Sequence, residues 1–270
     1  MVEVEVVLER KIMLKETTHL KESGHWYGQN GIPVYTTIGK NGKERPTTLR
    51  DARKANPHYV PGVTTFLNTT AKPGLELWKI KQAVLSSLTL PRIQFETDDE
   101  YIYRILKDGK EESKKAAERG TKIHAWIQQG YEGKEKELSD EGKLYYWAAK
   151  RAIDKECGIH EWKSEQPFAT SKYGSKIDLI CDDYVLDFKT KDVSLDGLKV
   201  YDEHKMQLVA CQQGVGHKGK IGIVFVSTKD VAAKVIMCED DGGKYLNMFN
   251  LLVEYWYAKS GLCNPHPERR

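Results

Sequence analysis

Residues 174–190, GSKIDLICDDYVLDFKT, constrain the fold more than any other stretch of this chain. Two apolar runs, 176–181 and 184–190, flank a short polar break, and this pattern predicts two antiparallel strands joined by a tight turn. Charged residues nevertheless interrupt both runs: Asp178 the first, and Asp187 and Lys189 the second. A buried strand pair does not ordinarily carry such charges, so they point to a specific role.

Strand alternation predicts how this pair is arranged. A two-residue turn at Asp182-Asp183 would place Cys181 opposite Tyr184, and the pairing would continue to Lys176 opposite Lys189. Side chains of like character then share a face. The apolar face holds Ile177, Leu179, Leu186 and Phe188, and the charged face holds Lys176, Asp178, Asp187 and Lys189.

In this register Asp178 lies directly opposite Asp187. Opposed side chains are about 5 Å apart at Cβ, and two carboxylates at that separation repel. A bound Mg²⁺ or Mn²⁺ would offset the repulsion, because these ions prefer convergent carboxylates. The alternative is a solvated face on which the lysines neutralise the aspartates.

Two further side chains are candidates for the same site. The preceding strand, SEQPFAT, would place Glu165 on the face of Asp178; the alternative is a lone surface glutamate. In the helix predicted around residues 114–131, His124 shares an apolar face with Ile123 and Ile127, where a histidine packed in the core is the common case. The opposite face carries a basic arc that suits either solvent or a phosphate backbone, including Lys115, Arg119 and Lys122.

The rest of the chain predicts a mixed α/β or α+β fold. Residues 1–48 are β-rich by their turn signals, and 57–68 read as extended. Helices are expected from Pro73, over 97–131 with a break at Asp108-Gly109, and over 138–156, 201–214 and 242–259. Strands are expected over 161–190, 220–227 and 231–238.

Composition narrows the class of protein. The 270 residues carry a net charge of +3, so nucleic-acid binding would need local clusters of basic residues. The five scattered cysteines predict reduced thiols in a cytoplasmic protein, with neither disulfides nor a zinc site. The N-terminus lacks the pattern of a signal peptide, and no apolar run is long enough to span a membrane.

Five motifs occur in order: GTKIH ending at His124, Glu165, GSKID ending at Asp178, LDFKT with Asp187 and Lys189, and HKMQL with Gln207. In this order and spacing the chain resembles the RecB-like branch of the PD-(D/E)XK nuclease superfamily, which includes lambda-type and mitochondrial genome-maintenance exonucleases. The resemblance covers residues 115–228. It implies a restriction-endonuclease-like core with a central mixed sheet flanked by helices.

The resemblance also implies roles for residues. Metal ligands would be His124, Asp178, Asp187, the Phe188 carbonyl and Glu165, holding one or two Mg²⁺ or Mn²⁺ ions. Lys189 would position the attacking water, with Glu165, Asp178 and Asp187 as its catalytic partners. Contacts to nucleic acid would come from Gln207, Lys115, Arg119, Lys122, Lys176 and Thr190. The family's Q-x-x-x-Y motif has Cys211 in place of tyrosine, and the cysteines of an iron–sulfur cluster have no counterpart, so no cluster is expected.

The implied activity is that of a metal-dependent DNA exonuclease, phage-encoded and acting in the host cytoplasm in recombination, repair or degradation. Its partners would be single- or double-stranded DNA with ends, and a recombination or single-strand-annealing protein. The alternatives are a structure-specific or restriction-type endonuclease, a non-catalytic nucleic-acid-binding module of the same fold, and a metal hydrolase of unrelated fold.

The expected organisation has three parts. Residues 1–100 would be an extension shaping the substrate channel, 101–262 the nuclease core and 263–270 a loose tail. Within the extension, Trp26, Tyr27 or Trp78 would either stack on bases or pack in the core.

Overall fold

The computed structural model describes residues 25–262. It is a mixed α/β structure built on a five-stranded mixed sheet. The described residues divide into two compact units: 67–166 and 176–252 form one, and 25–66, 167–175 and 253–262 form the other. By contacts, residues 67–100 therefore group with 101–166. The predicted tail, 263–270, lies outside the described residues.

The sheet has the strand order β5-β6-β7-β8-β9. β7 runs antiparallel to β6 and parallel to β8, and β9 is antiparallel to β8. The strands are β5 (Lys163–Ala169), β6 (Gly174–Ile180), β7 (Tyr184–Lys191), β8 (Lys220–Ser227) and β9 (Ala232–Cys238). The three strands predicted within 161–190 and the hairpin after residue 220 are thus confirmed.

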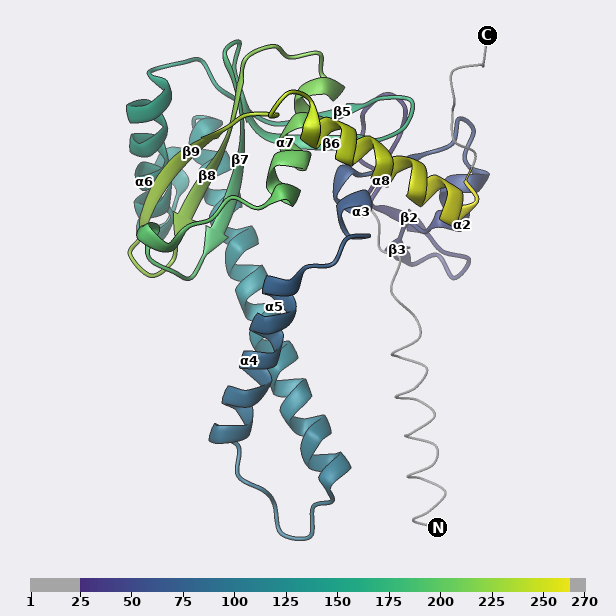
Figure 1. Cartoon of the computed structure of the whole chain (residues 1–270), viewed down its shortest axis with the longest axis vertical. Helices are drawn as coiled ribbons and strands as arrows, with labels where there is room; N and C mark the ends of the chain where they lie inside the picture. The colour runs from purple at the N-terminus through teal and green to yellow at the C-terminus, as the bar shows by residue number, and fades with distance from the viewer. Residues whose placement is uncertain (1–24, 263–270) are drawn as a thin grey trace. The chain divides into compact units, whose positions relative to one another are not determined.

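Helices lie on both faces of this sheet. α5 (Asp98–Tyr131) and α6 (Asp140–Cys157) share a core cluster with Leu186 and Phe188 of β7. α7 (Asp202–Gly214) links the parallel strands β7 and β8 and faces the side of the sheet that bears Asp187 and Phe225. Figure 1 shows α6 and α7 on opposite sides of β7, β8 and β9.

α5 spans the range predicted for it, 97–131, to within one residue, but it has no break. It continues unbroken through Asp108-Gly109, so the expected break there is wrong. The reason is tertiary: α4 (Pro73–Thr89), which begins at Pro73 as predicted, packs alongside, and Ser86 Oγ donates a 2.7 Å hydrogen bond to Asp108 Oδ2. Gly109 leaves room for the backbone of Ala83.

The second unit contains short strands and aromatic side chains. β1 (Trp26–Tyr27) pairs with β4 (Val60–Pro61), and β2 (Thr36–Ile38) with β3 (Glu44–Pro46). The prediction that 57–68 are extended is wrong in part, because α3 (Val63–Leu67) follows β4. α2 (Leu49–Lys54) precedes β4. Trp26 packs on Trp256 near the end of α8 (Lys244–Ser260) and is 1% exposed, so core packing explains it.

Candidate functional site

The β6–β7 hairpin has the predicted turn and register. Leu179 pairs with Leu186, Ile180 pairs with Val185, and the Cys181 amide donates a 3.0 Å hydrogen bond to the Tyr184 carbonyl. The apolar face is fully buried, as expected for the side that packs under α5 and α6. Its side chains are Ile177, Leu179, Leu186 and Phe188.

The predicted pairing fails one residue farther along the strands. The β6–β7 register ends at Leu179–Leu186, so Asp178 is not the direct partner of Asp187. Instead Oδ2 of Asp178 accepts a 2.8 Å hydrogen bond from the backbone N–H of Phe188. A carboxylate side chain thus satisfies a β7 donor at the point where the two strands separate. The carboxylate of Asp178 therefore lies where β6 and β7 separate, and we call this place the junction.

Asp187 and Lys189 lie on the α7 face of β7 with Gln207, as alternation predicts. Lys189 Nζ is 2.6 Å from Asp187 Oδ2, and Gln207 Nε2 donates a 2.7 Å hydrogen bond to Asp187 Oδ1. The other end of the Gln207 amide accepts a 3.0 Å hydrogen bond from Lys189 Nζ. One amide therefore fixes both the carboxylate and the ammonium group.

His124 reaches the junction from α5. Its Nδ1 is 3.9 Å from Asp178 Oδ2, and its ring meets that of Phe188 edge-on with centroids 5.9 Å apart. Its neighbours Ile123 and Ile127 are fully buried, which confirms the predicted apolar face of the helix. Burial lowers the pKa of His124, with Lys189 adding to the effect and Asp187 opposing it. The imidazole is consequently neutral near pH 7, which is the form that binds metals.

Glu165 of β5 and Lys176 of β6 form an ion pair beside the junction. Glu165 has a positive φ of 52°, an unusual backbone conformation for a glutamate. Its charge is among those that raise the pKa of Asp178, so the predicted third acidic group does lie within electrostatic reach of that residue. Lys176, predicted to contact nucleic acid, here neutralises Glu165.

The electrostatics of the junction are dominated by crowded negative charge. Burial, and then the charge of Asp187, raise the pKa of Asp178 to about 8, against the opposing effects of Lys189 and the Phe188 amide. Burial alone would lower the pKa of Lys189, but Asp187 and Asp178 together leave it above its ordinary value. Lys189 is therefore a permanent cation near neutral pH, and Asp178 is largely protonated there.

Within residues 25–262, no three His, Cys, Asp or Glu side chains converge as closely as a metal site requires. The ammonium group of Lys189 occupies the place that a cation would take on Asp187 Oδ2. The donors themselves suit a hard divalent ion: two crowded carboxylates, a neutral imidazole and a third carboxylate nearby. A 10 Å³ cavity beside Asp178, Asp187 and Gln207 is about the size of one water molecule.

The remaining predicted nucleic-acid contacts are dispersed. Lys115 and Arg119 are exposed on α5, with Lys115 bonded to Glu112 at 2.6 Å. Lys122 lies 3.7 Å from Glu141 of α6 and 4.5 Å from the ring of Trp126. Thr190 lies near Gly120, and its buried hydroxyl has no hydrogen-bond partner within the described chain. None of the four contacts Asp187 or Asp178 directly.

Two further residues of α7 lie near the junction: His204, which was not predicted to belong to it, and Cys211, which was identified only as the departure from the Q-x-x-x-Y motif. His204, one turn before Gln207 on α7, is buried against Phe225, and its pKa falls to about 4 through burial and the charge of Lys189. Cys211, one turn after Gln207, lines the small cavity at the position of the absent tyrosine. The spacing of three residues between His204 and Gln207 on one helix is the sequence signal that could have identified His204.

Comparison with known proteins adds no assignment. No model of a known protein family matches this sequence, and no curated protein matches it significantly. The described residues also contain no helix with the length and apolar character to cross a membrane.

Proposed function

We propose that this protein is a metal-dependent DNA exonuclease that hydrolyses phosphodiester bonds at the β6–β7 junction. The observation that carries the proposal is the meeting of Asp178, Asp187 and Lys189 there, with Gln207 holding two of them. The order of motifs resembling the RecB-like nucleases supports the same activity. The preference for DNA ends rests on that resemblance alone.

In this proposal Asp178 and Asp187 hold one or two Mg²⁺ or Mn²⁺ ions, together with His124, the Phe188 carbonyl and Glu165. A bound ion would supply an activated water and neutralise charge on the phosphate. Asp178 must lose its proton to serve as a ligand, since its pKa is about 8 without metal. The cation would offset the burial of this carboxylate and the charge of Asp187, which together raise this pKa.

Lys189 acts as a cation in this proposal rather than as a base, because its raised pKa keeps it protonated. Its ammonium group can donate hydrogen bonds to a phosphate oxygen and to the attacking water. Gln207 positions Lys189 through the 3.0 Å bond to Nζ. Stabilisation of developing phosphate charge by a preorganised cation is a large contribution in such reactions.

The experiment is digestion of 5′- and 3′-labelled single- and double-stranded DNA and of a closed circle, with Mg²⁺, Mn²⁺ or EDTA. We expect stepwise loss of nucleotides from linear DNA with either metal and none with EDTA. Asp187→Ala and Lys189→Ala should abolish cleavage, whereas Asp182→Asn, at the exposed turn of the same hairpin, should retain it. Cleavage of the circle would favour an endonuclease, and binding without cleavage would favour a non-catalytic module.

A further inference from the structure

The α4–α5 hairpin carries an unusual share of exposed apolar surface. We call residues 73–112 the arm; Figure 1 shows its two helices side by side. Of the 22 large apolar side chains that are exposed among the described residues, eleven lie between residues 75 and 106. They are Leu75, Leu77, Ile80, Val84, Leu85, Leu88, Ile93, Phe95, Ile102, Tyr103 and Leu106. Contiguous apolar surface of this kind marks an interaction site.

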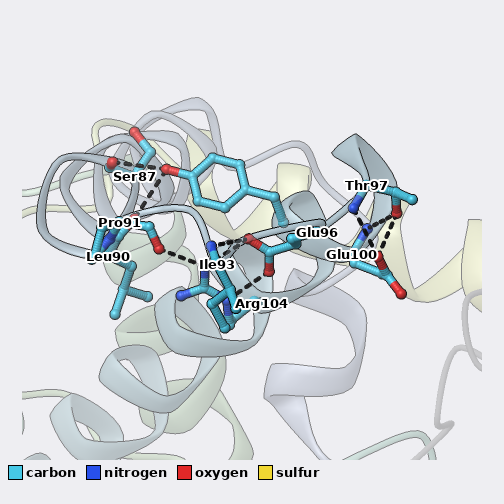
Figure 2. Close-up of polar contacts among 9 residues, drawn as sticks. Ser87, Leu90, Pro91, Ile93, Glu96, Thr97, Glu100 and Arg104 are labelled. Carbon is cyan, nitrogen blue, oxygen red and sulfur yellow. Dashed lines mark hydrogen bonds and ion pairs between the residues drawn. The ribbon is translucent and has the colours of Figure 1, made fainter.

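The loop at the tip of the arm is held by hydrogen bonds from side chains of α5. Arg104 donates to Glu96 at 2.9 Å and to the Pro91 carbonyl at 2.8 Å, and the Tyr101 hydroxyl contacts the carbonyls of Ser87 and Leu90 at 3.0 and 3.1 Å. Figure 2 shows these bonds converging on the loop, with the Thr97–Glu100 capping box beside them.

This loop presents Phe95 to solvent. Phe95 is 92% exposed and has a φ of 68°, a left-handed conformation that is unusual for a phenylalanine. Ile93, beside it in the loop, is 61% exposed. An exposed aromatic side chain on a loop held by hydrogen bonds can serve as an anchor for a binding partner. We call Phe95 the knob.

The same arm contains a groove that could receive such a knob. It is an open, shallow groove with a volume of about 350 Å³, lined by Lys79, Ile80, Ala83, Val84, Ser87 and Leu106. A mostly apolar groove of that size can accept an aromatic side chain. Phe95 and the groove thus lie on the same arm. Phe95 is in the loop at its tip, and the groove is on the rest of the arm, residues 73–91 and 101–112, which we call the shaft.

Charge along the arm favours pairing of tip with shaft. Residues 92–100 hold four carboxylates and one arginine, whereas the rest of the arm, 73–91 and 101–112, holds five basic residues and four carboxylates. Two arms lying antiparallel would bring each acidic tip onto the other's shaft, where the net charge is slightly positive and Lys79 lines the groove. The acidic tip argues against DNA as its ligand, because phosphates would be repelled there.

We propose that the arm binds a second copy of this chain, with Phe95 of each copy in the groove of the other. Such a contact is self-complementary, as a two-fold symmetric dimer requires. Covering the apolar side chains of both arms would remove on the order of 1,000 Å² from water, the size at which specific interfaces begin. The tip lies about 39 Å along α5 from His124, at 1.5 Å per residue, so this interface is separate from the proposed nuclease site.

The test is sedimentation of the full chain over the micromolar range. We expect a concentration-dependent dimer. Phe95→Asn, which tolerates the left-handed backbone, and Val84→Glu in the groove should each weaken it at least tenfold. Ile159→Asn is the matched control, since Ile159 is 88% exposed and lies outside the arm. Circular dichroism would confirm that each variant is folded.

Reciprocity gives a sharper test. A mixture of the Phe95→Asn and Val84→Glu chains retains one intact knob-and-groove contact per mixed dimer, whereas either variant alone retains none. The mixture should therefore dimerise more strongly than either variant. A wild-type chain that stays monomeric would overturn the proposal, as would a dimer that is insensitive to both substitutions or a mixture no stronger than its components.

Discussion

The backbone N–H of Phe188 donates a 2.8 Å hydrogen bond to Oδ2 of Asp178, at the point where β6 stops pairing with β7. This bond favours the ionised carboxylate, yet burial and the charge of Asp187 outweigh it and raise the pKa of Asp178 to about 8. Lys189 neutralises Asp187, whereas Asp178 keeps its proton near pH 7, and the consequences of this raised pKa can be measured.

Mg²⁺ affinity should depend on pH through Asp178. Binding must displace its proton below about pH 8, so the association constant should rise about tenfold per pH unit between pH 6 and 8 and level off above. Calorimetric Mg²⁺ titrations at several pH values would measure this slope. Asp178→Asn should weaken binding and flatten the profile. A flat profile in the wild-type protein would rule out Asp178 as a ligand that ionises on binding.

Gln207 should matter to turnover although its amide carries no charge. It holds Asp187 and Lys189 in one arrangement, and loss of such a supporting group typically costs 10–100-fold in activity. Gln207→Ala should lower the DNA cleavage rate by about that factor while the melting temperature changes little. Gln213→Ala, on the exposed side of the same helix, should be indistinguishable from wild type in the same assay. Equal rates for both variants would remove Gln207 from the site.

The sequence predicts the hairpin but not its break. A two-residue turn at Asp182-Asp183 and the alternation of side chains together give the register at Leu179–Leu186. The separation of the strands at Asp178 depends on a side chain accepting the Phe188 amide, which no periodic pattern encodes. The same distinction explains α5: Asp108-Gly109 is a local break signal, and packing against α4 overrides it.

The arm illustrates a different limit. An apolar stripe on a helix, such as Leu77, Ile80 and Val84, ordinarily predicts a face turned into the core. Here these side chains are 52–69% exposed, because α4 meets α5 through another face that includes Ser86. Periodicity identifies an apolar face without saying what covers it.

His204 should make the protein sensitive to mild acid. Burial holds its pKa near 4, whereas an unfolded chain takes up this proton below about pH 6.5, so stability is lost as pH falls through that interval. This difference in pKa corresponds to about 3 kcal/mol at most. His204→Gln removes the titration while keeping a polar side chain near the Tyr201 amide.

The measurement is urea unfolding of metal-free wild type and His204→Gln at pH 7 and pH 4.5. Asp178 acts in the opposite direction, because its raised pKa contributes stability at low pH that is lost as pH rises through about 8. Comparing the two proteins at each pH cancels that contribution. The variant should gain on wild type at pH 4.5, and an equal difference at both pH values would show that His204 does not titrate as proposed.

The same substitution at two glycines of α5 should have opposite effects. A Cβ at Gly109 would lie 3.6 Å from the Ala83 backbone, an ordinary contact, so Gly109→Ala should stabilise the protein by up to about 1 kcal/mol through helix propensity. A Cβ at Gly130 would clash with the ring of Tyr146 on α6. Gly130→Ala should therefore lower the free energy of unfolding by about 1–3 kcal/mol through overpacking. Thermal and urea unfolding of the two variants against wild type would measure both. Destabilisation by Gly109→Ala would mean that α4 and α5 approach more closely than the Ser86–Asp108 contact indicates.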